Sequence, residues 1–194
     1  MGNSNHIIRA LKPEETIRMQ DIIFRSVTTA DIPELKELFC NTVLTVNARD
    51  YTTEEVADWA SCGNRPGHWE KLFATLHFIA VCNGQGRIIG FTSIRNDGYL
   101  NSMFIHKDYQ RQGIASALLH RIEAYAAEHG ISEITSEVSI TARPFFEKQG
   151  YIVELEQRAQ ATRLQLINYK MRKQMKDGNT GFEKVYQMPL GKVY

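Results

Sequence analysis

Two apolar strand-like runs flank one long amphipathic helix between Gly98 and Ser139, and this arrangement constrains the fold of the chain more than any other feature. The first run is 98–105 (GYLNSMFI) and the second is 131–139 (ISEITSEVS). Apolar residues between them recur every three or four positions, which is the spacing of one buried helix face. They are Ile114, Ala117, Leu118, Ile122, Tyr125 and Ala126. A strand, a helix and a second strand in this order predict a right-handed crossover within one sheet.

The rest of the chain supplies further strands and helices around this crossover. Strands are expected at 21–27, at 77–94 as a hairpin that turns at Asn83–Gly86, at 151–157 and at 164–171. Helices are expected at 28–43 with Asp31 as N-cap, at 52–60 after Thr52 or Thr53, at 66–76 and at 141–150. This order predicts a mixed α/β (α+β) fold. We expect one domain at 21–172, with 1–20 as an N-terminal extension and 173–194 as a C-terminal tail.

The charge of the chain gives no global electrostatic attraction to nucleic acid or to a membrane surface. Its 194 residues include 23 Lys and Arg against 22 Asp and Glu, a formal net charge of +1. Cys40, Cys62 and Cys82 are odd in number and widely spaced, which fits neither a disulfide framework nor a zinc site. No uncharged apolar run approaches the roughly 18 residues of a membrane span, and residues 1–10 lack the apolar core of a signal peptide. We therefore expect a cytoplasmic protein without a metal, whose partners bind through local chemistry.

The join between the first strand and the helix of the crossover has the features of an anion site. Gln110, Arg111 and Gln112 lead into the helix without a preferred N-cap side chain. The first amides of a helix have no partner inside it, and together with the helix dipole they favour phosphate. Gly113 lets a ligand approach the backbone, and Arg111 adds a cation at the rim. The join matches neither a Walker loop nor the three-glycine dinucleotide fingerprint, so the residues alone are compatible with a structural turn or a phosphate site.

Two motifs make the chain resemble the GNAT (general N-acetyltransferase) superfamily. The segment 110–115 (QRQGIA) is similar to the Gln/Arg-x-x-Gly-x-Gly/Ala signature of that family. The segment 139–151 (SITARPFFEKQGY) resembles its second signature, Asn-x-x-Ala-x-x-Phe-Tyr-x-x-x-Gly-Phe. The resemblance extends roughly from Ile22 to Arg172 and includes the order of the expected elements. It implies a central mixed, mostly antiparallel, twisted sheet flanked by helices.

The resemblance also implies an acetyl-CoA-dependent N-acetyltransferase that transfers an acetyl group directly, in a ternary complex, to a primary amine on a small molecule or a protein. Acetyl-CoA would be a co-substrate, no metal is implied, and members of the family often form homodimers. The pyrophosphate would lie on the signature loop, at Arg111, Gln112, Gly113, Ile114, Ala115 and Ser116. The pantetheine arm would pair with the strand that carries Met103, Phe104 and Ile105, and would be flanked by Ser139, Phe145 and Lys148.

The proton path is the part of the resemblance that the sequence does not complete. Phe146 stands at the tyrosine position of the second signature and has no proton to give, while Tyr99 stands where some protein-acetylating members place a glutamate. Three interpretations are open. In the first, Tyr99, Tyr109 or Tyr151 supplies the acid while water or His106 takes the amine proton. In the second, the thiolate leaves without help, since an ordinary thiol has a pKa of about 8.5. In the third, the chain is a non-catalytic acetyl-CoA-binding regulatory protein.

The segment between the first strand and the hairpin often covers the acceptor site in members of the resembled family. It contains Tyr51, Trp59 and Trp69. For Trp59 the simplest expectation is a place in the core rather than in a pocket. No motif in the sequence identifies the acceptor.

Overall fold

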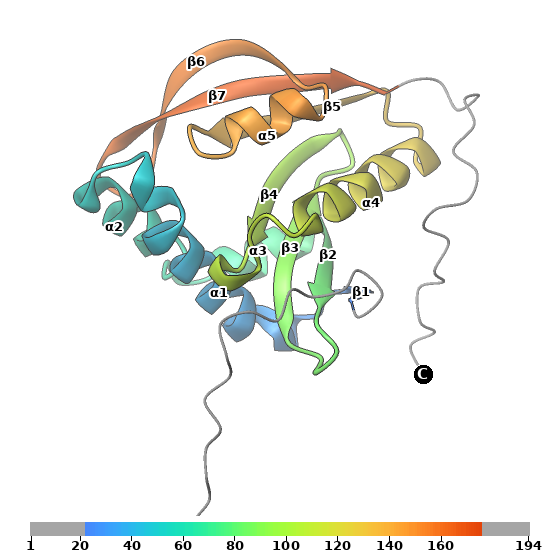
Figure 1. Cartoon of the computed structure of the whole chain (residues 1–194), viewed down its shortest axis with the longest axis horizontal. Coiled ribbons are helices and arrows are strands. Elements are labelled where there is room, and N and C mark those ends of the chain that lie inside the picture. The colour runs from blue at the N-terminus through green and yellow to red at the C-terminus, as the bar shows by residue number, and fades with distance from the viewer. Residues whose placement is uncertain (1–21, 176–194) are drawn as a thin grey trace, which may run out of the picture.

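The structure of the protein is a computed structural model, which describes residues 22–175. A seven-stranded sheet with the order β1-β2-β3-β4-β5-β7-β6 forms its centre (Figure 1). The strands are β1 (Ile23–Ser26), β2 (His77–Cys82), β3 (Ile88–Ile94), β4 (Tyr99–Ile105), β5 (Glu133–Ser139), β6 (Ile152–Gln160) and β7 (Gln165–Gln174). Neighbouring strands are antiparallel except β4 and β5, which are parallel. The predicted crossover and the mixed, mostly antiparallel sheet are confirmed.

Helices cover both faces of this sheet. They are α1 (Ile32–Thr45), α2 (Thr53–Cys62), α3 (His68–Thr75), α4 (Ile114–Glu128) and α5 (Arg143–Lys148), with short 3₁₀ turns η2 (Thr29–Asp31), η3 (Asn47–Arg49) and η4 (Lys107–Tyr109). One core cluster joins α1, α2 and α3 to the sheet around Phe91, and the other joins α4 and α5 to it around Ile134. Within residues 22–175, no helix has the length and apolar character needed to cross a membrane.

The parting of β4 from β5 is the feature that positions the site. The two strands pair at Tyr99 with Thr135 and at Leu100 with Ser136, and at no later position. The register of β3 against β4 also shifts between Ser93 and Ile94. A parallel pair that separates after two residues leaves the second half of β4 with an open edge. That edge faces the space between the two helical layers.

Both α1 and α2 begin after the predicted N-cap residue, but only α2 has a side-chain capping bond. The Thr52 hydroxyl accepts a hydrogen bond from the Glu55 amide, and the Glu55 carboxylate accepts one from the Thr52 amide, which forms a capping box. Asp31 stands at the N-cap position of α1 but makes no capping bond there. Its carboxylate instead pairs with Arg25 at 2.7 Å and accepts from the Thr28 amide. The Asp31 carboxylate pairs with Arg25 and does not cap α1, because β1 places Arg25 beside Asp31.

The last two strands are longer than predicted and form an arm that reaches away from the rest of the sheet. β6 extends three residues beyond the expected end at 157, and β7 three residues beyond 171. β7 lies between β5 and β6, so β6 is an edge strand. In Figure 1 the arm of β6 and β7 passes over α5, and its far end lies next to α2. The expected extension at 1–20 lies outside the described residues, as does the tail from residue 176 onward.

Candidate active site

A cleft of about 970 Å³ opens where β4 and β5 part. Its walls come from both helical layers: α1, α2 and α3 on one side, and the start of α4 with α5 on the other. The arm of β6 and β7 contributes the remaining wall, through residues such as Ala161 and Leu166. A volume of this size accommodates a ligand larger than most metabolites.

The start of α4 presents unpaired backbone donors to this cleft. Gly113 occupies the N-cap position with φ +82° and provides no side-chain cap. The amides of Gly113, Ile114, Ala115 and Ser116 donate to no acceptor within residues 22–175. Arg111 has φ +62°, a conformation that costs a non-glycine residue about 1–2 kcal/mol. The loop therefore holds a strained backbone and an uncapped fifteen-residue helix whose positive dipole end faces the cleft.

All but one of the predicted coenzyme contacts line the cleft. They are Met103, Phe104, Ile105, Arg111, Gly113, Ile114, Ala115, Ser116, Ser139, Phe145 and Lys148. Gln112 is the exception, and its side-chain amide donates to the Asp108 carbonyl at 3.3 Å. The strand edge, the helix start and α5 thus meet at one end of the cleft, as the sequence predicted for one ligand.

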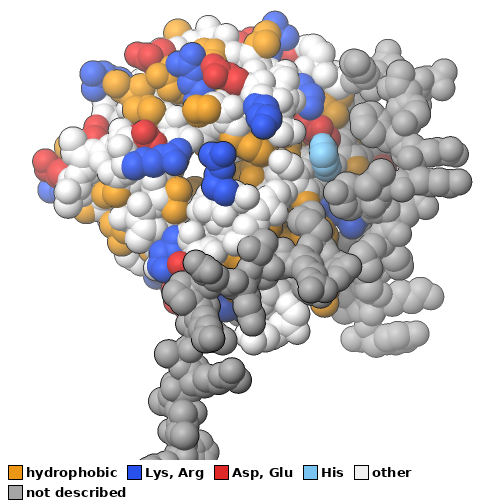
Figure 2. All heavy atoms as spheres, in the orientation of Figure 1, with side chains coloured by type: hydrophobic (Ala, Val, Ile, Leu, Met, Phe, Trp, Pro, Cys, Tyr) orange, Lys and Arg blue, Asp and Glu red, His pale blue; other side chains and the backbone are white. Residues whose placement is uncertain are grey.

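The charges on the cleft wall are mostly positive. Arg49, Arg65, Arg111 and Lys148 line it, and Glu137 is the sole carboxylate among its described lining residues. Figure 2 shows Lys and Arg side chains over the middle of the viewed face, with hydrophobic side chains between them. This charge pattern suits a ligand that carries phosphate groups on one part.

The three catalytic candidates from the sequence do not lie together. Tyr99 lines the cleft, and burial raises the pKa of its phenol, with Glu137 raising it further. Tyr151 is 2% exposed in the core beneath α4, where its ring packs edge-on against Phe146 at 5.0 Å. Burial also raises the pKa of Tyr151. A hydroxyl that stays protonated but is enclosed in the core does not reach a reactant in the cleft.

His106 is also directed away from the cleft. It follows the end of β4, is 8% exposed, and its Nδ1 accepts from the Asp108 amide at 3.3 Å. Its ring lines a separate small cavity together with Glu34, Glu37 and Arg87. Burial lowers the pKa of His106, so the imidazole is neutral at physiological pH. Of these three, Tyr99 alone lines the cleft. Tyr109, the other tyrosine that the sequence offered as an acid, lines it too, and its hydroxyl accepts a hydrogen bond from the Asn83 side chain at 3.3 Å.

Phe146 occupies a packed position where the second signature has tyrosine. It is 4% exposed, contacts Phe145 and Tyr151 edge-on, and contributes a small part of the cleft wall. Its ring belongs to the core cluster under α4 and α5. No proton donor therefore stands at this point of the cleft.

Sequence reasoning did not identify Glu137. It lies on β5 two residues after Thr135, which pairs with Tyr99, so Glu137 and Tyr99 share one face of the sheet. Its carboxylate accepts a hydrogen bond from the Asn168 side chain at 3.4 Å and lines the cleft. The alternation of 131–139 indicates a solvent-side residue at 137, but only the β4–β5 register brings it near Tyr99.

The end of the cleft between α2 and the arm, which we call the acceptor end, is aromatic. Trp59 is half-buried and lines the cleft, contrary to the expectation of a core position. Its ring lies 5.7 Å from that of Tyr51 and 6.4 Å from that of Phe104. The Tyr51 hydroxyl donates to the Ile167 carbonyl at 2.7 Å, and burial raises the pKa of Tyr51 to about 12. Tyr51 is thus a neutral structural tie that supports the exposed face of Trp59.

Comparison with known proteins gives a consistent result. An acetyltransferase (GNAT) domain model matches residues 47–173. The chain is 32% identical over 155 residues to the uncharacterized N-acetyltransferase YafP of Escherichia coli (strain K12), covering 79% of this chain and 97% of that protein. It superposes on a GCN5-related N-acetyltransferase of Rhodopseudomonas palustris with a TM-score of 0.77 at 22% identity, covering 81% and 98% of the two chains. The PaiA N-acetyltransferase of Thermoplasma acidophilum in complex with coenzyme A gives 0.64 at 19% identity, covering 79% and 98%.

Proposed function

Because the chain belongs to the GNAT acetyltransferase family, and is thus an acetyl-CoA-dependent N-acetyltransferase, we propose that it transfers the acetyl group directly to a primary amine in a ternary complex. The observation that carries this proposal is the meeting of three features in one cleft. These are the uncapped start of α4, the open edge of β4 and the carboxylate of Glu137.

The coenzyme end fits acetyl-CoA chemically. The free amides from Gly113 to Ser116 and the positive end of the α4 dipole suit a pyrophosphate. The edge of β4 beyond Leu100 suits an extended amide-bearing arm, which can pair with it as an added strand. Arg111 and Lys148 add positive charge at the rim. Acetyl-CoA supplies an activated thioester, and these residues hold it in place.

On the acceptor side we assign the proton-accepting role to Glu137. An amine is protonated at neutral pH and must lose a proton before it attacks an acyl carbon. Glu137 is the carboxylate of the described cleft wall, and it holds an ammonium by charge before accepting its proton directly or through one water. Asn168 donates to the carboxylate and restricts its orientation. No sequence motif surrounds Glu137, but a proton acceptor needs only the right position in the cleft.

Tyr99 is suited to donate a hydrogen bond to the departing sulfur. Burial raises its pKa, so the phenol keeps its proton through the neutral range. A phenol whose pKa exceeds about 10 is a weaker acid than a thiol near 8.5, so complete proton transfer to the thiolate is uphill. We therefore assign Tyr99 a hydrogen-bonding role, and the thiolate leaves with this assistance rather than by full protonation.

The single carboxylate also limits the acceptor. A polyamine with several ammonium groups would need several carboxylates for charge complementarity, and the described wall offers one, Glu137, while Arg65 and His68 also line it. The exposed faces of Trp59 and Phe104 instead suit an apolar or aromatic body next to the amine. We infer that the acceptor is a monoamine with an apolar body.

A thiol-release assay with acetyl-CoA and a panel of amines tests the proposal. We expect turnover with arylalkyl monoamines and little with spermidine or with lysine-containing peptides. Calorimetry with CoA runs in parallel. Tight CoA binding without turnover on any amine would overturn the catalytic proposal and favour a regulatory acetyl-CoA-binding protein, for which Phe146 at the tyrosine position is the motivating residue.

A further inference from the structure

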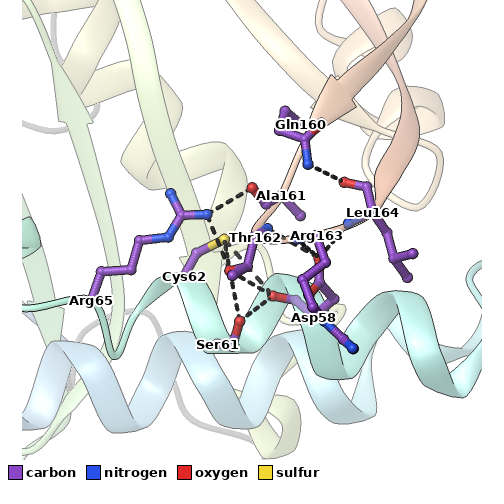
Figure 3. Close-up of polar contacts among 9 residues, drawn as sticks. All are labelled: Asp58, Ser61, Cys62, Arg65, Gln160, Ala161, Thr162, Arg163 and Leu164. Carbon is purple, nitrogen blue, oxygen red and sulfur yellow. Dashed lines mark hydrogen bonds and ion pairs between the residues drawn. The ribbon is translucent and has the colours of Figure 1, made fainter.

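One buried carboxylate fixes the tip of the β6–β7 hairpin to α2. Asp58, in the middle of α2, is 3% exposed. Its Oδ2 accepts hydrogen bonds from three successive backbone amides at the tip, those of Thr162 at 3.0 Å, Arg163 at 2.8 Å and Leu164 at 2.9 Å (Figure 3). Three consecutive amides directed at one point form an anion-binding nest, and here the anion is a side chain of the same protein.

A second set of contacts surrounds this carboxylate. The hydroxyls of Ser61 and Thr162 lie 2.7 Å apart. Arg65 donates from Nη2 to the Ala161 carbonyl at 2.7 Å and to the Thr162 hydroxyl at 3.1 Å. Figure 3 shows Asp58, Ser61 and Arg65 reaching the tip from the α2 side. The tip is thus bonded through its amides, a carbonyl and a side chain at once.

The clamp, meaning Asp58, Ser61 and Arg65 with the tip residues 161–164, joins two parts of the fold that are distant in the sequence. Asp58 and Leu164 are separated by 106 positions. The arm belongs to one end of the sheet, whereas α2 belongs to the helical layer that also contains α1 and α3 (Figure 1). Besides the clamp, the tip is held by the packing of Ala161, Leu164 and Leu166 against the core cluster around Phe91.

The α2 side and the arm side of the clamp both line the acceptor end of the cleft. Trp59, Cys62 and Arg65 contribute from α2 or just beyond it. Ala159, Gln160 and Ala161 contribute from the arm. A shift of the tip away from α2 would therefore widen the cleft between these two walls.

We propose that Asp58 is a positioning residue that holds the acceptor end of the cleft in its binding geometry. It touches neither substrate and acts through the tip of the arm. The inference rests on the proposed function for its kinetic consequence, since an acceptor must be held within a short distance of the acyl carbon. The coenzyme end is built from β4, α4 and α5, to which the clamp makes no hydrogen bond within residues 22–175. Loss of the clamp therefore affects acceptor binding and leaves coenzyme binding intact.

Hydrogen–deuterium exchange of the Asp58→Asn variant tests the clamp directly. Asn carries no charge and has one acceptor oxygen, so its NH₂ group must face either the three tip amides or Arg163 Nε, which donates to Oδ1, and the nest loses its anion. We expect the amides of Thr162, Arg163 and Leu164 to exchange about tenfold faster or more, while the core strands exchange as in the wild type. Unchanged exchange at the tip would overturn the proposal, whatever the enzyme acetylates.

Kinetics test the functional consequence with the best amine of the panel. For Asp58→Asn we expect the acceptor KM to rise about tenfold or more, with the CoA Kd within about twofold of wild type. Asp31→Asn is the control for general destabilisation, because Asp31 is also an ion-paired carboxylate but lies outside the cleft. Arg163→Ala separates the nest from the ion pair at the tip, because it removes the exposed guanidinium that pairs with Asp58 Oδ1 at 3.2 Å and keeps the three amides. We expect it to raise the acceptor KM less than Asp58→Asn does.

The outcomes separate the clamp from the proposed function. Equal rises in acceptor KM for Asp58→Asn and Asp31→Asn, or a matching loss of CoA affinity, would overturn the positioning role. If the wild type acetylates no amine, the proposed function fails while exchange at the tip still decides whether the clamp exists. If Asp58→Asn does not fold, Ser61→Ala with Thr162→Ala weakens the clamp without stranding the buried charge. For that double variant we expect a smaller rise in acceptor KM, again with an unchanged CoA Kd. An unchanged acceptor KM would overturn the proposal.

Discussion

Glu137 on β5 and Tyr99 on β4 face one cleft from neighbouring parallel strands. The register pairs Tyr99 with Thr135, and the two-residue period of a strand brings Glu137 to the same face. The negative charge of Glu137 adds to burial in raising the pKa of the Tyr99 phenol. A charged proton acceptor and a neutral hydrogen-bond donor are thereby placed side by side at neutral pH. This pairing offers a proton path in a chain whose second signature lacks its tyrosine.

Glu137→Gln tests the proton acceptor. We expect kcat/KM for the amine to fall about a hundredfold or more, as is typical when a general base is removed, with CoA binding unchanged. The loss should shrink as the pH rises, because more of the amine is then already neutral. Glu133→Gln is the matched control, since Glu133 lies on the same strand and face but is outside the cleft wall and pairs with Arg172. An equal loss in both variants would contradict the assignment.

Gly113→Glu tests the coenzyme end. A carboxylate at the start of α4 places like charge within a few ångströms of the pyrophosphate, which costs about 3 kcal/mol, or roughly a hundredfold in Kd. The positive φ of Gly113 adds strain for any side chain, so charge and strain must be separated. Gly113→Asn provides that control, because asparagine tolerates positive φ. Calorimetry with CoA should show a much larger loss for the Glu variant, and equal losses would argue against a phosphate at this position.

Phe146→Tyr tests whether the signature tyrosine can be restored. Phe146 borders the cleft at one edge but is otherwise packed in the core. If the added hydroxyl faces the cleft, kcat should stay within about threefold of wild type or rise at neutral pH, because a phenol with a pKa near 10 adds a hydrogen-bond donor. If the hydroxyl is buried without a partner, the variant should lose about 1–3 kcal/mol of stability. Thermal unfolding and thiol release together distinguish the two results, and a large loss of kcat at unchanged stability would contradict the prediction.

The sequence predicts the local part of this structure well for physical reasons. Helix periodicity, the capping box at Thr52 and the glycine at the start of α4 act within a few residues, so a short window contains the whole signal. The coenzyme end is built from such windows. The residues proposed to contact the coenzyme between Met103 and Ser116 are nearly continuous in the chain, and the family resemblance implied them together.

The acceptor end depends instead on long-range pairings that no window contains. The proximity of Glu137 to Tyr99 depends on the β4–β5 register, and the bonds of Asp58 reach a hairpin tip more than one hundred positions later. The opening of the cleft also exposes Trp59, although tryptophan as a residue type favours the core. When the role of a residue depends on its position in the fold, no short sequence window contains a signal for it. For this reason the sequence did not predict the proton path or the wall of the acceptor end.

The pH dependence of stability provides the last prediction. Hydrogen bonds from the tip amides, that of Leu164 first, lower the pKa of Asp58 from its ordinary 3.8 to about 2. Because the folded-state pKa lies below the unfolded-state value, ionised Asp58 contributes stability above about pH 4, and this contribution is lost as the pH falls toward 2. The hydrogen bond from Arg25 lowers the pKa of Asp31 from 3.8 to about 2 in the same way.

Urea unfolding between about pH 5 and pH 2.5 should therefore show a falling midpoint for the wild type and a flatter one for both Asp58→Asn and Asp31→Asn. The protection factors of the Thr162–Leu164 amides, which correct exchange for its intrinsic pH dependence, should fall over that interval in the wild type and in Asp31→Asn, and should already be low at pH 5 in Asp58→Asn. Protection factors at the tip that do not fall at all between about pH 5 and pH 2.5 in the wild type would show that the ionised carboxylate is not what holds the arm against α2.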